Sequence, residues 1–316
     1  MKILFLSTRN PSKQGDLLEI CILNGLRKLL GSNCIDYPRK KIMYHDWSET
    51  EKGSLHGRGF NLLTHPIEDI SNESRNNFDD IDFILYGCGW IYGENAYTNL
   101  EQIVDPDKVW YLDSHDLYGI GSNMIEYNNE LVIGNQKYPS FKREMIIKEK
   151  NIYSTGLGIP AWSIFPLNFE NKTQLYQLTS PDDCLFKPVT DLGNRKGHKF
   201  SNENEYNDDI RCSWFGLTCL RGGWDSLRIY EIISNGALLL FKDYDKKPPL
   251  CSPQNLPCYS YSTLDELNGL FDRLLVNGKP TREYFNMLNK QRTWLINNGT
   301  CEARALHILN TLKKHL

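Results

Sequence analysis

The chain has 316 residues, of which 40% are hydrophobic and 24% are charged, as is typical of a soluble globular protein long enough for two domains. A formal net charge of −3, from 36 basic and 39 acidic side chains, gives no support for non-specific nucleic-acid binding through overall charge and leaves only a local basic cleft open. The nine cysteines lack the spacing of zinc ligands, and no apolar run is long enough to cross a bilayer, so we expect a cytoplasmic protein with reduced thiols.

The N-terminal half alternates predicted strands with a helix. Residues 2–7 are a continuous apolar run, as in a buried parallel strand, and apolar side chains then recur at helical spacing from about residue 16 until Gly31. This order predicts a parallel α/β sheet, because crossover helices join parallel strands. The other predicted strands of this half are residues 34–37, 81–86, 108–113, 131–133 and 164–167.

The C-terminal half shows the same alternation after a polar stretch, residues 168–183, which we interpret as a link between domains. The predicted domains are therefore residues 1–168 and 183–316, each with an α/β core. Predicted strands of this half are residues 184–186, 214–220, 237–241 and 259–261, and predicted helices are residues 264–276, 281–297 and 301–314.

Residues 221–231 are the most informative segment of the sequence. Gly222 and Gly223 lie between a predicted strand and a short predicted helix, and without a Cβ they let backbone N–H groups approach a ligand closely. A helix N-terminus beside such a turn favours an anion such as a diphosphate. The alternative is a plain turn that only joins strand to helix.

The short helix after this turn carries further candidate ligands. Asp225 or Ser226 can cap its first turn, and Gly236 can end it. Glu231 can accept hydrogen bonds from a ribose, since a buried carboxylate needs polar partners. Arg228 can neutralise a diphosphate, or it can form a salt bridge with Glu231 at i,i+3 spacing.

These residues carry a resemblance to a known family. The runs 215–231 and 236–239 resemble the donor-binding segment of GT-B glycosyltransferases, and are similar to the exostosin-like and spore-protein-CgeB-like groups. In the N-terminal half, residues 113–116 and 141–144 resemble motifs of the same transferases. The resemblance covers most of the chain. It implies two Rossmann-like domains that face each other across a cleft, with the last helix packing back on the N-terminal domain.

The resemblance also implies a metal-independent site without a cofactor, in which the nucleotide-sugar is a co-substrate. Many retaining members carry a second acidic residue eight positions before the ribose-binding glutamate, where this chain has Gly223, so inverting and retaining outcomes both stay open. The candidates for the donor site are Gly222, Gly223, Ser226, Arg228 and Glu231, with Arg195 as a further cation or a solvated loop charge.

Asp113, His115 and Asp116 follow a predicted strand end, where ligands of α/β proteins bind, and are the candidates for a general base. The alternative is a structural role, with Asp116 capping a turn. Lys142-Arg143-Glu144 can steer an anionic acceptor, brace the domain interface or form solvated ion pairs. Trp224 can stack on a sugar or base ring, or it can lie in the core.

Together these expectations describe a hexosyl- or pentosyltransferase that moves a sugar from a nucleotide-sugar, such as a UDP-sugar, to an acceptor hydroxyl. Glycans, proteins, small molecules and modified nucleobases are all open as acceptors. Two alternatives on the same fold also stay open: a non-catalytic nucleotide-sugar-binding protein and a sugar-nucleotide epimerase.

Overall fold

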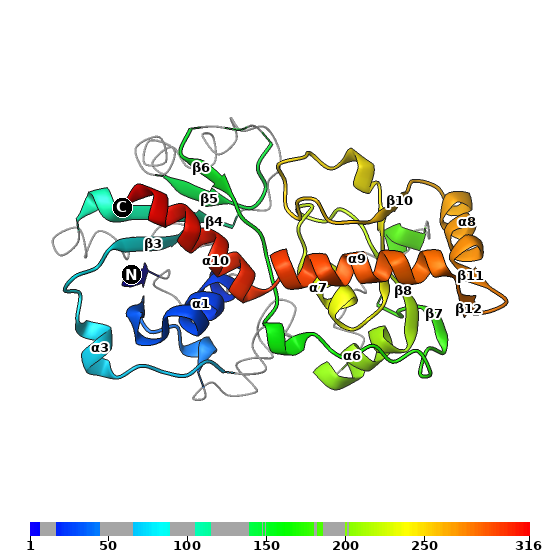
Figure 1. Ribbon diagram of the computed structural model, residues 1–316, viewed down its shortest axis with the longest axis horizontal. Helices are drawn as coiled ribbons and strands as arrows, with labels where there is room; N and C mark the ends of the chain where they lie inside the picture. Colours follow the sequence, from blue (N-terminus) through cyan, green and yellow to red (C-terminus); the bar gives the residue numbers. More distant parts are fainter. Residues whose placement is uncertain are drawn as a thin grey trace, which may run out of the picture.

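The computed structural model describes residues 1–6, 17–44, 66–88, 105–114, 139–146, 148, 150–179, 182–185, 200 and 202–316. Within these residues the chain forms a six-stranded and a four-stranded parallel sheet, which lie side by side along the long axis (Figure 1). We call the part around the six-stranded sheet the first lobe and the part around the four-stranded sheet the second lobe. The predicted α/β class with parallel sheets is confirmed.

The first lobe has the strand order β2-β1-β3-β4-β5-β6, and all neighbouring strands are parallel. In β1, Ile3 and Phe5 join the apolar cluster that contains the side chains of helix α1 (Leu17–Leu30), whereas Leu4 and Leu6 join the cluster on the other face. Both faces are thus covered, as parallel sheets require. The strands are β1 (Ile3–Leu6), β2 (Cys34–Tyr37), β3 (Phe83–Cys88), β4 (Val109–Asp113), β5 (Ser140–Lys142) and β6 (Ile152–Ser154).

The sequence predicts the longer strands of this lobe and misses the shorter ones. β2 and β4 lie within predicted ranges, β3 begins two residues later than predicted, and Gly31, with a φ of +56°, ends α1 as expected. β5 and β6 have three residues each, too few to show a period. The predicted strand at 131–133 lies outside the described residues.

The second lobe has the order β10-β9-β8-β7, also parallel. Helix α7 (Leu227–Ser234) packs closely on strand β8 (Ser213–Thr218). A Cβ added at Gly216 of β8 would lie only 2.2 Å from the side chain of Ile232 of α7. The strands are β7 (Gln174–Tyr176), β8 (Ser213–Thr218), β9 (Leu238–Lys242) and β10 (Tyr259–Tyr261). The helices are α6 (Glu203–Arg211), α7 (Leu227–Ser234), α8 (Leu264–Leu274) and α9 (Arg282–Asn298), and β11 (Leu275–Val276) pairs with β12 (Lys279–Pro280) after α8.

Three predictions around the lobe boundary are wrong. The stretch 168–183, interpreted as a link, contains β7, which pairs with β8, so the second sheet begins before residue 183. The predicted strand at 184–186 overlaps a 3₁₀ helix, Asp182–Leu185. Residues 164–167 form no strand, because Phe165 N–H donates to Ser234 O in a loop instead of joining a sheet.

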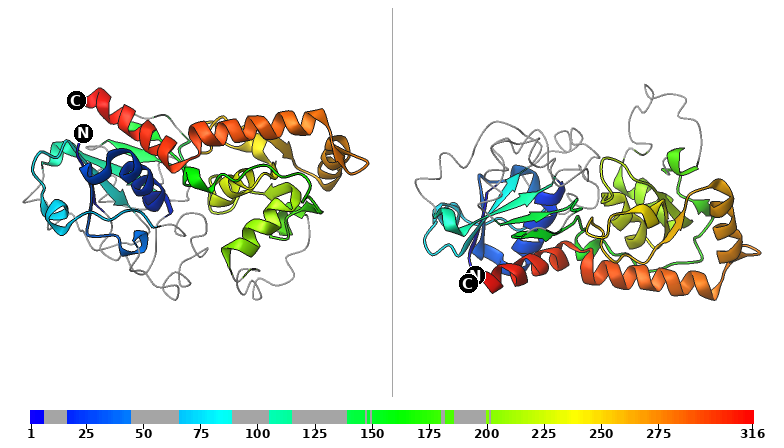
Figure 2. Two further views of the ribbon diagram at one scale, coloured as in Figure 1. Left: turned by 60° about the horizontal axis from the view of Figure 1, so that its bottom comes forward. Right: turned by 90° about the horizontal axis from the view of Figure 1, so that it is seen from above.

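The described residues contain two crossings between the lobes, and these two crossings pair with each other. Ile159 N–H donates to Gly299 O at 3.1 Å, and Cys301 N–H donates to Ile159 O at 2.8 Å, which forms a parallel bridge between Ile159 and Thr300. After the second crossing, α10 (Cys301–Leu312) returns to the first lobe and packs against α1, so both termini lie on that lobe (Figures 1 and 2).

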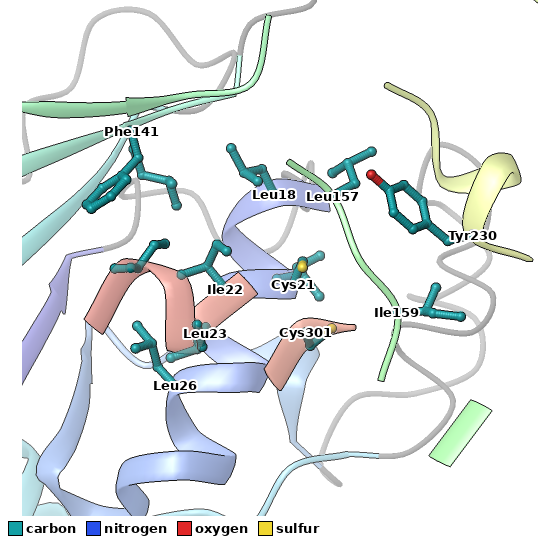
Figure 3. Packing of buried hydrophobic residues seen from close by; sticks show 14 of the residues in the cluster. Leu18, Cys21, Ile22, Leu23, Leu26, Phe141, Leu157, Ile159, Tyr230 and Cys301 are labelled. Atoms are coloured by element: carbon teal, nitrogen blue, oxygen red, sulfur yellow. The ribbon is translucent and has the colours of Figure 1, made fainter. Parts of the chain in front are cut away.

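The lobes share one continuous core. A single cluster of buried apolar side chains includes β1, α1 and α10 in the first lobe and α7 and β9 in the second. Figure 3 shows the first crossing, which carries Leu157 and Ile159, running between Cys21 of α1 and Tyr230 of α7. The relative position of the lobes is therefore stabilised by burial of apolar surface as well as by hydrogen bonds.

Basic side chains gather at the C-terminal end of α7. Lys172 donates to Ser213 O and, at 2.8 Å, to Gly236 O, while Arg292 donates to Ile233 O and Ser234 O. Gly236, with a φ of +78°, ends the helix as predicted. The Arg292 cation beside the Ile233 and Ser234 carbonyls complements the negative end of the helix dipole.

Lys172 makes the stability of this region dependent on pH. Burial, and to a lesser extent the charge of Arg292, lower the pKa of Lys172 to about 7. Between pH 7 and 10 the unfolded chain thus holds a proton that the folded chain lacks, so stability rises with pH, by up to about 1.4 kcal/mol per pH unit. Denaturant unfolding across this range is expected to show a shallower rise for Lys172→Met but not for the exposed Lys290→Met. Parallel curves for Lys172→Met and the parent protein would contradict this.

Candidate functional site

The carboxyl end of the first sheet contacts the segment that follows β8 of the second. Arg143, directly after β5, donates from one guanidinium nitrogen to Asp225 O at 2.6 Å and from the other to Ser114 O at 3.0 Å. Asp225 belongs to the segment between β8 and α7 that contains the glycine turn. Ligands of open α/β sheets bind outside the carboxyl ends of the strands, and here such ends from both lobes meet.

Asp225 is the centre of a buried hydrogen-bond network between the lobes. Its carboxylate accepts from Leu157 N–H and from the Tyr230 hydroxyl, each at 2.7 Å, and its own N–H donates to Glu144 Oε1 at 2.9 Å. We call this set, with Arg143 and Arg304, the interlobe network. Arg304 of α10 extends it, because its guanidinium donates to Leu157 O and to the Tyr230 hydroxyl.

These contacts correct the predicted cap of α7. Ser226 occupies the N-cap position, but its hydroxyl accepts no hydrogen bond from the first turn of the helix. The Asp225 carboxylate is directed to Leu157 and Tyr230 and is 2% exposed as a residue. A sequence pattern cannot show this, because Leu157 lies 68 residues away along the chain.

The segment Lys142-Arg143-Glu144 braces the interface between the lobes. All three residues are buried, which rules out solvated ion pairs. Burial raises the pKa of Glu144 above its usual value, although the charge of Arg143 opposes the shift. Lys142 forms a salt bridge with Asp113 at 3.0 Å.

Asp113 is the candidate base that the structure describes. It ends β4 and is 4% exposed, with its carboxylate ion-paired to Lys142. His115, Asp116 and the candidate cation Arg195 lie outside the described residues. The carboxyl edge of the first sheet therefore carries a buried ion pair, Asp113 with Lys142, beside the interlobe network.

The second-lobe candidates lie close together on α7. Arg228 donates to Thr179 O, and Glu231 accepts from the hydroxyl of Tyr206 on α6. Arg228 also lies over the Tyr206 ring, 5.9 Å from its centroid. Burial works against the charge of Arg228, but its pKa is nevertheless raised, with the nearby Glu231 carboxylate among the causes, so the guanidinium stays cationic. Glu231 is 6% exposed and lies among polar partners.

The glycine turn presents one exposed and one buried glycine. Gly222 is exposed and Gly223 is buried, and Arg221 N–H donates to Gly223 O at 3.3 Å across the turn. Trp224 is buried in the core against Phe241, with ring centroids 5.9 Å apart, so the structural alternative holds for it and it does not stack on a ligand.

Tyr206 is a neighbour of the candidate residues that the sequence prediction misses, because α6 is not predicted. The helix is short and polar, and its buried apolar side chains, Tyr206 and Ile210, are only two in number. Two signals in the sequence identify this helix. Tyr206 and Ile210 have i,i+4 spacing, and Asn202 precedes them as a cap, with its side chain accepting from Glu205 N–H.

Three further observations concern the described residues alone. No helix in these ranges is both long and apolar enough to cross a membrane. The described cysteines are thiols, most of them buried. Within the same ranges, no group of three His, Cys, Asp or Glu side chains is placed to hold a metal ion.

Comparison of the chain with models of known protein families gives no match, and comparison with curated proteins gives none either.

Proposed function

We propose that the chain is a glycosyltransferase that binds a nucleotide-sugar through the second lobe and an acceptor through the first. The observation that carries the proposal is the cluster of Arg228, Glu231 and Tyr206 on and beside α7, where that helix follows the glycine turn. A cation and an acid at this place match the charges of a diphosphate and the hydroxyls of a ribose.

In this proposal each group acts on a different part of the donor. Glu231 accepts hydrogen bonds from the ribose hydroxyls, since a carboxylate only accepts. Arg228 and the backbone N–H groups near Gly222 and Ser226 stabilise the negative charge that develops on the leaving diphosphate. Asp113, beside Lys142, lies on the acceptor side, where a general base takes the proton of the attacking hydroxyl.

A non-catalytic nucleotide-sugar-binding protein is the second candidate. The observation that favours it is the salt bridge of the buried Asp113 with Lys142, because the ammonium group occupies the carboxylate oxygen Oδ2, at which a general base could accept a proton. Turnover distinguishes the two candidates: an enzyme transfers sugar to an acceptor, or slowly to water, whereas a binding protein leaves the bound donor intact.

Glu231→Gln is expected to weaken binding of a nucleoside diphosphate about tenfold or more, since hydrogen bonds to a charged group contribute about 1.5–3 kcal/mol. A thermal-shift screen of nucleoside diphosphates and their sugars, with UDP first, measures this. In the parent protein, ligand at about 100 times its Kd stabilises by about 2.7 kcal/mol. Glutamine still accepts a hydrogen bond from Tyr206, so the unliganded Tm is expected to change little.

The matched control is Glu170→Gln, which makes the same chemical change at an exposed position of the same lobe. It is expected to bind UDP as the parent protein does. A parent protein that responds to no nucleoside diphosphate, or an unchanged affinity in Glu231→Gln, would contradict the proposal.

A further inference from the structure

Tyr206 fixes one oxygen of the Glu231 carboxylate. The Tyr206 hydroxyl donates to Glu231 Oε2, and Tyr206 is 5% exposed as a residue. Burial, reinforced by the adjacent charge of Glu231, raises the pKa of Tyr206, so the hydroxyl keeps its proton and remains a donor. The carboxylate is therefore held by a neutral donor from a different helix.

Helix α6, which carries Tyr206, is anchored to α7 independently of this hydrogen bond. The Asn235 amide donates to Asn207 Oδ1 and to Glu231 O, both at 2.9 Å, and Arg211 Nε donates to Asn235 Oδ1 at 3.0 Å. These contacts lie further along α6, so removal of the Tyr206 hydroxyl leaves the helix in place.

A carboxylate held in one orientation discriminates between sugar ligands more strongly than one that rotates freely. A carboxylate that turns freely finds some hydrogen bond with almost any sugar, whereas one held from one side requires donors at set positions. A site built to hydrogen-bond a hydroxyl discriminates strongly against an analogue that lacks it, because the protein group is then left unpaired.

We propose that Tyr206 is a specificity-determining positioning residue, which orients Glu231 so that the site prefers ribonucleotides to 2′-deoxyribonucleotides. This inference rests on the proposed function, because it requires a nucleotide at Glu231. It assigns the role to a hydroxyl outside the segment that resembles the glycosyltransferases.

The test compares the affinities of UDP and 2′-deoxy-UDP, by calorimetry, for the parent protein and for Tyr206→Phe. If another nucleoside diphosphate responds more strongly in the screen, its ribo and deoxy forms are used. The parent protein is expected to prefer the ribonucleotide by about 100-fold, and Tyr206→Phe to lower this ratio about tenfold, mainly through weaker binding of the ribonucleotide. A merely structural role would weaken both ligands equally.

Tyr259→Phe is the matched control. It removes another tyrosine hydroxyl that donates to a glutamate, Glu283 Oε1 at 2.7 Å, elsewhere in the second lobe. This variant is expected to leave the ratio unchanged. A second measurement is the double variant Tyr206→Phe/Glu231→Gln, whose ratio is expected to fall no further than that of Glu231→Gln alone.

The outcomes separate the two proposals. If the parent protein binds nucleotides, but binds both forms equally or keeps its ratio in Tyr206→Phe, the role of Tyr206 is refuted and the proposed function stands. The role of Tyr206 is also refuted if the decreases in the ribo-to-deoxy affinity ratio caused by Tyr206→Phe and by Glu231→Gln add in the double variant. If the parent protein binds no nucleoside diphosphate, both proposals fail.

Discussion

Asp225→Ala is expected to lower the free energy of unfolding by about 3–5 kcal/mol. The substitution removes the acceptor of two hydrogen bonds and leaves the Leu157 N–H and the Tyr230 O–H donor without an acceptor where water does not reach. Each buried polar group left without a partner costs about 1–3 kcal/mol. Denaturant unfolding followed by circular dichroism measures the loss.

A double-mutant cycle shows whether the loss comes from this network. Tyr230→Phe removes one of the two donors, so Asp225→Ala is expected to cost about 1–2 kcal/mol less in that background. Asp272→Ala, which changes an exposed aspartate on α8, is expected to alter stability by no more than about 0.5 kcal/mol. A loss for Asp225→Ala as small as that for Asp272→Ala would refute the structural role of the interlobe network.

Gly25→Ala is expected to destabilise the protein by about 3 kcal/mol, although alanine is the better helix former. Gly25 lies in α1 where that helix meets α10, and a Cβ there would be 1.9 Å from Cys301 O and 2.8 Å from Ala305 Cβ. The obstacle is backbone, so the two helices must separate, and such overpacking exceeds the propensity gain of about 1 kcal/mol.

Gly269→Ala is expected to have the opposite effect and to stabilise the protein. Gly269 is also inside a helix, α8, but a Cβ there meets nothing within 4 Å. Only helix propensity acts at this position, so a gain of about 0.5–1 kcal/mol is expected. Thermal melts of the two variants side by side check both signs. A rise in Tm for both would show that α1 and α10 are not held as closely as described.

Local patterns predict most of this fold. The residues 34–37, 259–261 and 301–312 are strand or helix as the sequence indicates, because their apolar spacing and flanking residues agree with their burial. β7 is not predicted, because Gln174 and Tyr176 are only half-buried at a sheet edge and their polar neighbours resemble a linker. Its strand character depends on pairing with β8, which is a tertiary contact.

The sequence likewise predicts part of the candidate site and misses the rest. The sequence identifies Arg228 and Glu231 as neighbours on one helix, and the structure describes them beside one partner, Tyr206. It misassigns Asp225, because an aspartate before a helix normally caps it, whereas this one binds groups from the crossing segment and from the next turn. Long-range hydrogen bonds leave no periodic signal, so only the structure reveals the interlobe network.

The return of α10 to the first lobe has a consequence for the order in which the chain folds. Ile308 and Leu312 follow the second lobe in the sequence, yet they are buried in the same apolar cluster as Ile3. The second lobe ends with α9 at Asn298, so it is translated before α10 begins at Cys301. During synthesis the core of the first lobe is thus closed only after the second lobe has been translated, and deletion of residues 305–316 would uncover α1 while sparing the four-stranded sheet.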